Sequence, residues 1–326
     1  MSNTMQAVIV EGEAPLHLGD VKRPKLRANE VLVRVRAAGL NRADLLQRKG
    51  MYPPPKGASD IMGLECAGEI VSLGKSVKHW GIGDRVCALL AGGGYAEYAA
   101  VDAGSLLPVP KEMSFTQAAC LPEALMTVWA NVYDRCAFKK GEVFSVHGGT
   151  SGIGVMAIQM ARVFGASAIF ATAGSDAKCD TIRALGGEGT TAINYRTEDF
   201  EQIIQAAGGS DVILDMVGAD YVQKNISIIK TNGRIVNIAY MNGSQVSVNL
   251  LPLMLKRAVL TATTLRARDA KEKARLREAM QDTFWKAVET GEIKPVLDTV
   301  FPAAEAEAAH AKMAAGGHIG KIALEW

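Results

Sequence analysis

The chain has 326 residues, a net charge of +2, 48% hydrophobic residues and 21% charged residues. This length predicts two domains, and the small net charge argues against a nucleic acid or a membrane surface as partner. No apolar run is long enough to span a membrane and no signal peptide is visible, so we expect a cytoplasmic protein. The five cysteines are scattered and form no Cys-x-x-Cys pair, which predicts reduced, buried thiols.

The first 125 residues have the pattern of a β-rich region. Stretches typical of strands, separated by Gly, Pro and Asp turns, lie at residues 5–10, 30–37, 65–73, 85–90 and 94–101. Residues 41–48 predict a short helix, and the sequence MYPPP at residues 51–55 predicts a stiff extended loop.

Beyond residue 114 the pattern changes to alternating strands and helices. After a helix at 115–132, strands are predicted at 143–147, 168–172, 191–193, 212–215, 234–238 and 259–263. Intervening helices are predicted at 154–164, 177–185 and 200–206. This alternation indicates an α/β fold with a doubly wound parallel sheet. After a long helix at 270–290, a last strand at 319–324 is expected to pair with the N-terminal region, so the sheet domain is inserted into a discontinuous first domain.

The sequence FSVHGGTSGIG at residues 144–154 predicts a strand, a tight glycine turn and the start of a helix. Such a turn points free backbone N–H groups and a helix N-terminus at one place, where a pyrophosphate can bind. The glycine spacing differs from G-x-G-x-x-G and fits the G-x-x-x-G-x-G of short-chain dehydrogenases, which usually begin with this motif. The alternative is a glycine-rich turn without a ligand; we expect a bound dinucleotide.

The residues after the second strand favour NADPH over NADH. An NAD site has an acidic residue about 20 positions after the glycines. Here that position is Gly174, followed by Ser175 and Lys178, which can bind a 2′-phosphate. We interpret Asp176 as the N-cap of the next helix. The alternative for Lys178 is a solvated helix face.

Several further segments occur in a characteristic order: AGLNRADLLQR at 38–48, MYPPP at 51–55, GLE at 63–65, GDRV at 83–86, GGYAEY at 93–98, HGGTSGIG at 147–154 and IGKI at 319–322. In this order the whole chain resembles the quinone oxidoreductase branch of the medium-chain dehydrogenase/reductase superfamily. Within that branch it is most similar to the group of the p53-inducible quinone oxidoreductases and, more distantly, zeta-crystallin.

The resemblance implies a GroES-like β-barrel catalytic domain at residues 1–123 and 268–326, and a Rossmann domain that binds NADPH at residues 124–267. The cofactor would lie in the cleft between them. It also implies a homodimer formed by edge strands of the Rossmann sheets. Residues 259–265 are β-branched and suit such an edge. The alternative is an ordinary terminal strand covered by a helix.

We expect no metal site. Alcohol dehydrogenases of the same superfamily bind a catalytic zinc through a histidine before the glutamate and an early cysteine. Here these positions hold Leu64 and, in the early region, Gly39 and Asn41. Without a Lewis acid, the hydride acceptor should be electron-poor, such as a quinone or an activated enone.

The resemblance also implies the site residues. Those near the reacting atoms would be Asn41, Asp44, Tyr52 and Thr127. The alternatives are a helix cap at Asn41, an ion pair from Asp44 to Arg42 or Arg48, a packed loop aromatic and a packing threonine. Those near the cofactor would be Gly149, Thr150, Ser151, Gly152, Ile153, Gly174, Ser175, Lys178, Tyr195, Ile238, Ala239, Leu265 and Lys321. Tyr195 resembles the tyrosine that closes over the adenosine phosphate, with Arg196 beside it.

The sequence therefore predicts an NADPH-dependent, zinc-independent quinone oxidoreductase with a small-molecule substrate. An NADPH-dependent enoyl or alkenal reductase is the alternative within the same chemistry. A protein that binds NADPH or RNA without catalysis is the alternative outside it.

Overall fold

The computed structural model describes residues 3–12 and 14–326. The chain forms two compact units. The first unit comprises Met1–Met126, Arg266–Glu289 and Lys294–Trp326, and the second comprises Thr127–Leu265 and Thr290–Ile293. The expected divisions after residues 123 and 267 therefore fall close to those of the structure, and the short return of 290–293 to the second unit was not anticipated. Which unit is catalytic and which binds the cofactor stays a prediction.

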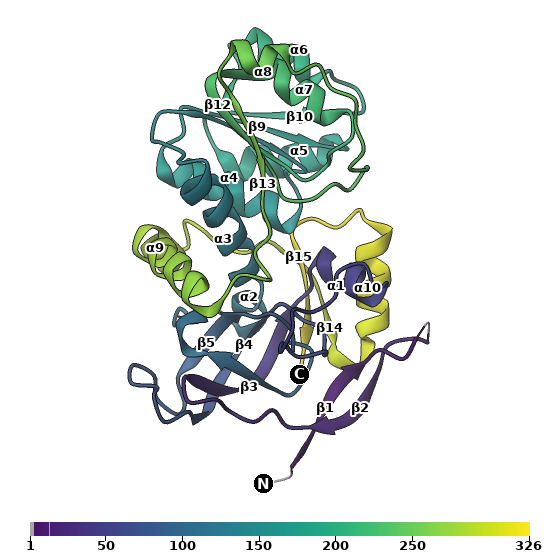
Figure 1. Cartoon of the computed structure of the whole chain (residues 1–326), viewed down its shortest axis with the longest axis vertical. Helices are drawn as coiled ribbons and strands as arrows, with labels where there is room; N and C mark the ends of the chain where they lie inside the picture. The colour runs from purple at the N-terminus through teal and green to yellow at the C-terminus, as the bar shows by residue number, and fades with distance from the viewer. Residues whose placement is uncertain (1–2, 13) are drawn as a thin grey trace. The chain divides into compact units, whose positions relative to one another are not determined.

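The first unit is built on a mostly antiparallel sheet (Figure 1). Its order is β14 (Leu297–Pro302), β15 (Lys321–Glu325), β3 (Glu30–Gly39), β4 (Glu65–Leu73), β5 (Arg85–Leu89) and β7 (Leu106–Pro108), and β6 (Tyr98–Asp102) also pairs with β3. A hairpin of β1 (Thr4–Ile9) and β2 (His17–Lys22) joins it through a bridge from Ala7 to Ala96. Alternate residues of β3, Val31, Val33 and Val35, point into one hydrophobic core.

The C-terminal strand pairs as predicted. β15 runs antiparallel to β3, with Ala323 opposite Gly39. This pairing brings Lys321 next to the start of helix α1 (Arg42–Arg48). The strand β14 and the helix α10 (Ala306–Ala315) were missed, because the alanine-rich stretch at 303–315 shows no clear apolar period.

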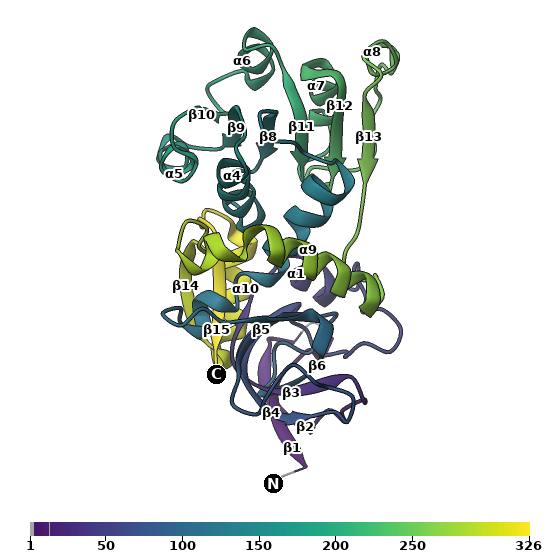
Figure 2. The same ribbon diagram turned by 90° about the vertical axis from the view of Figure 1, so that its left-hand side faces the viewer.

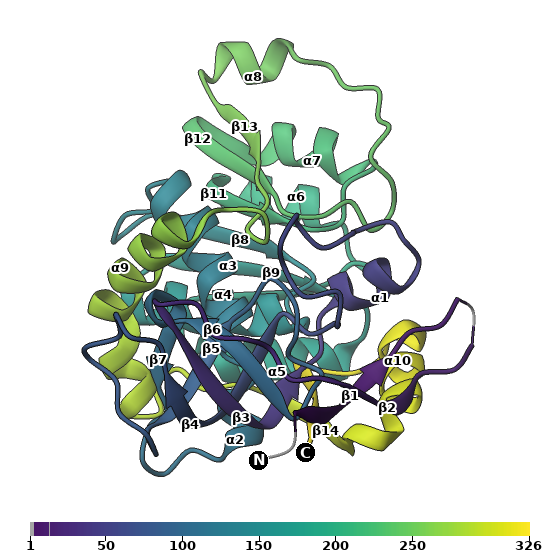
Figure 3. The ribbon, with the colours of Figure 1, turned by 60° about the horizontal axis from the view of Figure 1, so that its bottom comes forward.

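Helix α9 (Ala270–Glu289) belongs to the first unit and closely matches its predicted range. It packs on the 3-10 turn Ala103–Ser105, where Arg277 donates to the carbonyl of Gly104 at 3.0 Å (Figure 3). The single helix predicted at 115–132 is wrong. It is divided into α2 (Phe115–Ala118), α3 (Pro122–Val128) and a π-helical segment (Trp129–Arg135), because Pro122 has no N–H group to continue a helix.

The second unit is a parallel sheet (Figure 2). Its order is β10 (Thr190–Asn194), β9 (Ala168–Ala173), β8 (Val143–His147), β11 (Ser210–Asp215), β12 (Ile229–Asn237) and β13 (Val259–Ala262). Numbered along the chain, this is the 3-2-1-4-5-6 order of a Rossmann sheet, which confirms the predicted fold class. The helices are α4 (Gly152–Phe164), α5 (Asp176–Gly186), α6 (Phe200–Ala206), α7 (Tyr221–Ile228) and α8 (Leu251–Leu255).

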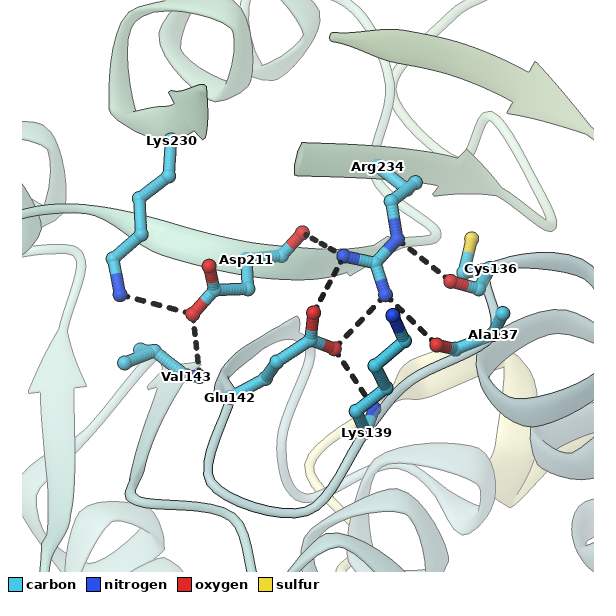
Figure 4. A network of polar contacts seen from close by, with 8 residues as sticks. All are labelled: Cys136, Ala137, Lys139, Glu142, Val143, Asp211, Lys230 and Arg234. Atoms are coloured by element: carbon cyan, nitrogen blue, oxygen red, sulfur yellow. Dashed lines mark hydrogen bonds and ion pairs between the residues drawn. The ribbon is translucent and has the colours of Figure 1, made fainter. Parts of the chain in front are cut away.

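An ion-pair network stands where β8 and β11 begin (Figure 4). Arg234 donates two hydrogen bonds of 2.9 Å to the two carboxylate oxygens of Glu142, and Lys230 pairs with Asp211 at 2.9 Å. Asp211 also accepts a bond from the amide of Val143. These bonds join the amino ends of the strands, so the opposite edge is the one that carries the glycine loop.

Across residues 3–12 and 14–326, no helix combines the length and apolar character needed to cross a bilayer.

Candidate active site

The glycine loop in the second unit joins β8 to α4. Ser151 caps the helix by accepting a bond from the amide of Gly154 at 3.0 Å. A Cβ atom on Gly154 would lie 2.2 Å from the carbonyl oxygen of Gly148, so only glycine fits there. Within the described residues, the amides of Thr150, Gly152 and Ile153 donate to no other atom. The loop therefore offers free N–H groups at a helix N-terminus, which suits a pyrophosphate.

The end of β9 gathers further predicted cofactor residues. A Cβ atom on Gly174 would lie 2.6 Å from the hydroxyl oxygen of Tyr195 and 3.5 Å from Nε of Arg196. Ser175, one position later, begins α5. Lys178 is half-buried and makes no ion pair within the described residues. A small space flanked by hydroxyl and cationic groups fits a 2′-phosphate.

The interpretation of Asp176 as a helix cap is wrong. Ser175 caps α5, because its hydroxyl accepts the bond from the amide of Lys178 at 3.4 Å. The Asp176 carboxylate instead accepts a bond of 2.7 Å from the side-chain amide of Asn194. It is thus held by the neighbouring strand β10.

The other predicted residues of the second unit lie along the carboxyl edge of the sheet or at its ends. Ile238 and Ala239 follow β12, and the amide of Ile238 donates to the Asp215 carbonyl at 2.9 Å. Leu265, the last residue before the first unit resumes, is buried. Thr127 is also buried, and its carbonyl accepts a bond from Asn131.

A cluster of buried polar side chains lies in the first unit. We call it the Lys321 cluster, and it consists of Asn41, Asp44, Glu65, Tyr95, Glu123 and Lys321. The Lys321 ammonium is 4% exposed and bonds to Glu65 at 2.6 Å, to the Leu40 carbonyl at 2.6 Å and to Oδ1 of Asn41 at 2.7 Å. These three contacts use all its N–H groups. The predicted contact between Lys321 and the cofactor thus gives way to one inside the first unit.

Asn41 and Asp44 meet in this cluster, as their spacing predicted. The Asn41 side chain donates to Glu65 at 3.0 Å and, more weakly, to the Gly39 carbonyl at 3.4 Å. Asp44 accepts bonds from the amide of Asn41 at 2.8 Å and from the hydroxyl of Tyr95 at 3.0 Å.

The alternative roles of these two residues have different outcomes. Asn41 is indeed the N-cap residue of α1, so it belongs to both the helix end and the cluster. The ion pair from Asp44 to a neighbouring arginine is wrong. Arg48 pairs with Glu307 at 2.9 Å, and Arg42 donates to the Met313 carbonyl.

Burial shifts the acids of the cluster towards neutral pH. It raises the pKa of Asp44 to about 6. Burial and the neighbouring Glu65 raise the pKa of Glu123 to about 7. Burial alone would lower the pKa of Lys321, but Glu65 outweighs it and the pKa is raised. Lys321 therefore stays a cation at neutral pH.

Two acids of this cluster were not recognised as site residues in the sequence. Glu65 accepts from both Lys321 and the amide of Glu123, the latter at 2.9 Å. The signals were present: Glu65 belongs to the GLE segment, and Glu123 follows the proline that starts α3.

Tyr52 lies in the loop between α1 and β4 and is half-buried. Arg266 donates to its carbonyl at 2.9 Å, and the guanidinium lies 5.2 Å from the centre of its ring. Burial raises the pKa of the Tyr52 phenol. Tyr52 and Lys56 have a Tyr-x-x-x-Lys spacing, but they lie in a proline loop and not on a helix.

Comparisons with known proteins agree with this arrangement. Residues 27–111 match the alcohol dehydrogenase GroES-like domain, and residues 188–324 match a zinc-binding dehydrogenase domain. The crystal structure of an NAD-dependent alcohol dehydrogenase is 28% identical, with a TM-score of 0.86, covering 99% of this chain and 100% of that one. The CurK enoyl reductase is 28% identical, with a TM-score of 0.83, covering 99% of both chains.

Among curated proteins, polyketide synthase GfsB of Streptomyces halstedii is 34% identical over 301 residues, which are 92% of this chain. The chain spans 5% of that synthase and at most 18% of the other synthases it matches. With both of its domains present, the chain belongs to the medium-chain dehydrogenase/reductase superfamily. These findings support an oxidoreductase that uses a pyridine nucleotide.

The residues of this chain do not fit a zinc ion. Within residues 3–12 and 14–326, no three His, Cys, Asp or Glu side chains are grouped so as to hold a metal. The Glu65 carboxylate is engaged by an ammonium group. Burial raises the pKa of the Cys66 thiol to about 12, whereas zinc ligands must be deprotonated. The Lys321 cluster therefore carries its own fixed cation.

Proposed function

We propose that this protein is an NADPH-dependent reductase of α,β-unsaturated carbonyl compounds that works without a metal ion. The observation that carries this proposal is the Asn41 amide, held in one orientation by Lys321 and Glu65. Its second N–H group is engaged only by the long contact to Gly39, so it is available to a substrate oxygen. The likeness to the CurK enoyl reductase supports the enoyl class.

In the second unit, the free amides after Gly149 would bind the pyrophosphate of the cofactor. Ser175 and Lys178 would bind the 2′-phosphate, with Tyr195 and Arg196 beside it. When bound, NADPH supplies a hydride. Lys178 is the basis for proposing NADPH instead of NADH.

In the first unit, Asn41 would donate to the carbonyl oxygen of the acceptor. Negative charge develops on that oxygen as hydride reaches the β-carbon, and a fixed donor stabilises it. Lys321, bonded to Oδ1 of Asn41, polarises the amide and keeps it from rotating. Tyr52, half-buried and held through Arg266, would form a wall of the acceptor site.

A proton must reach the α-carbon to complete the reduction. Glu123 is half-buried, and the pKa of about 7 keeps its carboxyl group partly protonated at neutral pH. We propose Glu123 as the group that holds this proton.

Steady-state kinetics of Asn41→Ala test this proposal. With crotonyl-N-acetylcysteamine as acceptor, we expect kcat to fall about a hundredfold while the Kd for NADPH stays unchanged. Asn29→Ala, which removes an exposed asparagine of the same unit, should keep full activity. An Asn41→Ala enzyme with unchanged kcat would refute the role of this amide.

Quinone reduction is the second candidate, supported by the order of the segments between residues 38 and 322 that resembles quinone oxidoreductases. A quinone needs the same hydride and a proton on oxygen. Comparing kcat/KM for 1,4-naphthoquinone, an ortho-quinone and the enoyl thioester separates the two candidates.

We also propose a homodimer through β13, the last strand of the Rossmann sheet. Val259 and Leu260 of this strand are 51% and 37% exposed, and Met254 and Leu255 of α8 are each 67% exposed. Light scattering should give twice the monomer mass for the protein and the monomer mass for Thr261→Pro, which removes a strand N–H.

A further inference from the structure

The first unit contains a pocket of about 640 Å³ that the proposed hydride chemistry does not use. Its walls come from β2, from the loop that follows Tyr52, from β6 and from the start of α9. Its volume lies within the range of small-molecule sites.

The pocket concentrates positive charge. Seven basic and three acidic side chains line it, a net charge of +4, whereas the whole chain carries +2. Charged concave surfaces of this kind raise the local concentration of oppositely charged ligands.

The acids of the pocket are engaged locally. Glu30 accepts a bond from the amide of Arg27, Asp102 from that of Gly104, and Asp269 from that of Glu272. In contrast, Lys22, Lys25 and Lys56 are exposed, and none of them has a side-chain partner within the described residues. Three cations therefore remain free for a ligand.

One lining residue also connects the pocket to the proposed acceptor site. Arg266 is 5% exposed and donates to the carbonyls of Ala91 and Tyr52. It is in turn held by Lys273, which donates to the Arg266 carbonyl at 2.8 Å. The pocket and the Tyr52 loop thus share one rigid residue.

We propose that this pocket binds the adenosine 3′,5′-bisphosphate end of a coenzyme A thioester, whose enoyl group is the acceptor. This inference rests on the proposed function and names its substrate class. The pyrophosphate and the 3′-phosphate together carry about four negative charges at pH 7, which match the net charge of the pocket. A carrier domain would bring a single phosphodiester, for which three free lysines are more than is needed.

The test compares two acceptors with the same enoyl group, crotonyl-CoA and crotonyl-N-acetylcysteamine. In K22E/K25E/K56E we expect KM for crotonyl-CoA to rise at least about tenfold, with kcat unchanged and KM for the phosphate-free thioester unchanged. The charge-matched control K75E/K78E/K111E reverses three exposed lysines of the same unit outside the pocket. It should leave all constants unchanged.

Calorimetry with 3′,5′-ADP tests the pocket apart from catalysis. With saturating NADP⁺ present, the unaltered protein should bind one 3′,5′-ADP, and K22E/K25E/K56E should not. Binding without reduction of either thioester would sustain the pocket and overturn the proposed function. Equal loss of KM for both thioesters, no binding of 3′,5′-ADP, or an effect confined to crotonyl groups on a carrier domain would overturn the pocket.

Discussion

The Lys321 cluster and the glycine loop are built on opposite principles. The cluster consists of charged and polar side chains, nearly all buried and bonded to one another. The loop consists of residues with little or no side chain, and its free groups are backbone amides. The cluster should therefore be most sensitive to the removal of a partner, and the loop to the addition of a single carbon atom.

The largest effect should come from Lys321→Met. The substitution leaves the Glu65 carboxylate buried without its cation, which costs about 3–5 kcal/mol of unfolding free energy. Urea denaturation followed by circular dichroism measures it.

The double variant E65Q/K321M is the control for this effect. Because it removes both charges, we expect it to regain most of the lost stability. If Lys321→Met cost less than about 1 kcal/mol, the pair would have the weight of a surface ion pair and the cluster would not be held by it.

Next in size is Gly154→Ala. The added Cβ would lie 2.2 Å from the Gly148 carbonyl oxygen, so the loop must shift. We expect the Kd for NADPH to rise about thirtyfold, or about 2 kcal/mol. Gly81→Ala, where the nearest atom is 3.7 Å away, is the matched control. Unchanged affinity in Gly154→Ala would mean that the cofactor does not bind at this loop.

A smaller effect is expected for Lys178→Ala. Loss of one cation beside the 2′-phosphate should raise KM for NADPH about tenfold and leave KM for NADH nearly unchanged. Lys111→Ala, at an exposed position of the first unit, should alter neither. Equal changes for the two cofactors would contradict the preference for NADPH.

The smallest effect concerns pH. The pKa of Glu123 is raised from 4.5 to about 7, so the folded protein holds this proton more tightly than the unfolded chain. The unfolding free energy should therefore fall as pH rises from 4.5 to about 7. Glu123→Gln should reduce that fall by about 1 kcal/mol, allowing for partial exposure. Glu112→Gln should not, and a fall of the same size in both would rule out Glu123 as its source.

The sequence predicted the second unit better than the first. Alternating strands and helices fix a parallel sheet, and the glycines near residue 150 mark its ligand edge by local spacing alone. The Lys321 cluster instead joins residues from both ends of the chain. Asn41 and Asp44 were found by their helical spacing, but nothing local to Lys321 indicates that β15 places it on Glu65. Burial, which shifts the pKa of Glu123, also depends on packing that no short pattern encodes.

The most direct test of metal-free hydride transfer is the fate of a labelled hydride. The enzyme is treated with a chelator, freed of it, and given NADPH deuterated at C4 of the nicotinamide with crotonyl-N-acetylcysteamine. We predict one deuterium on the β-carbon of the product, at the same kcat as before chelation. No deuterium in the product, or a rate that only added zinc restores, would contradict this account.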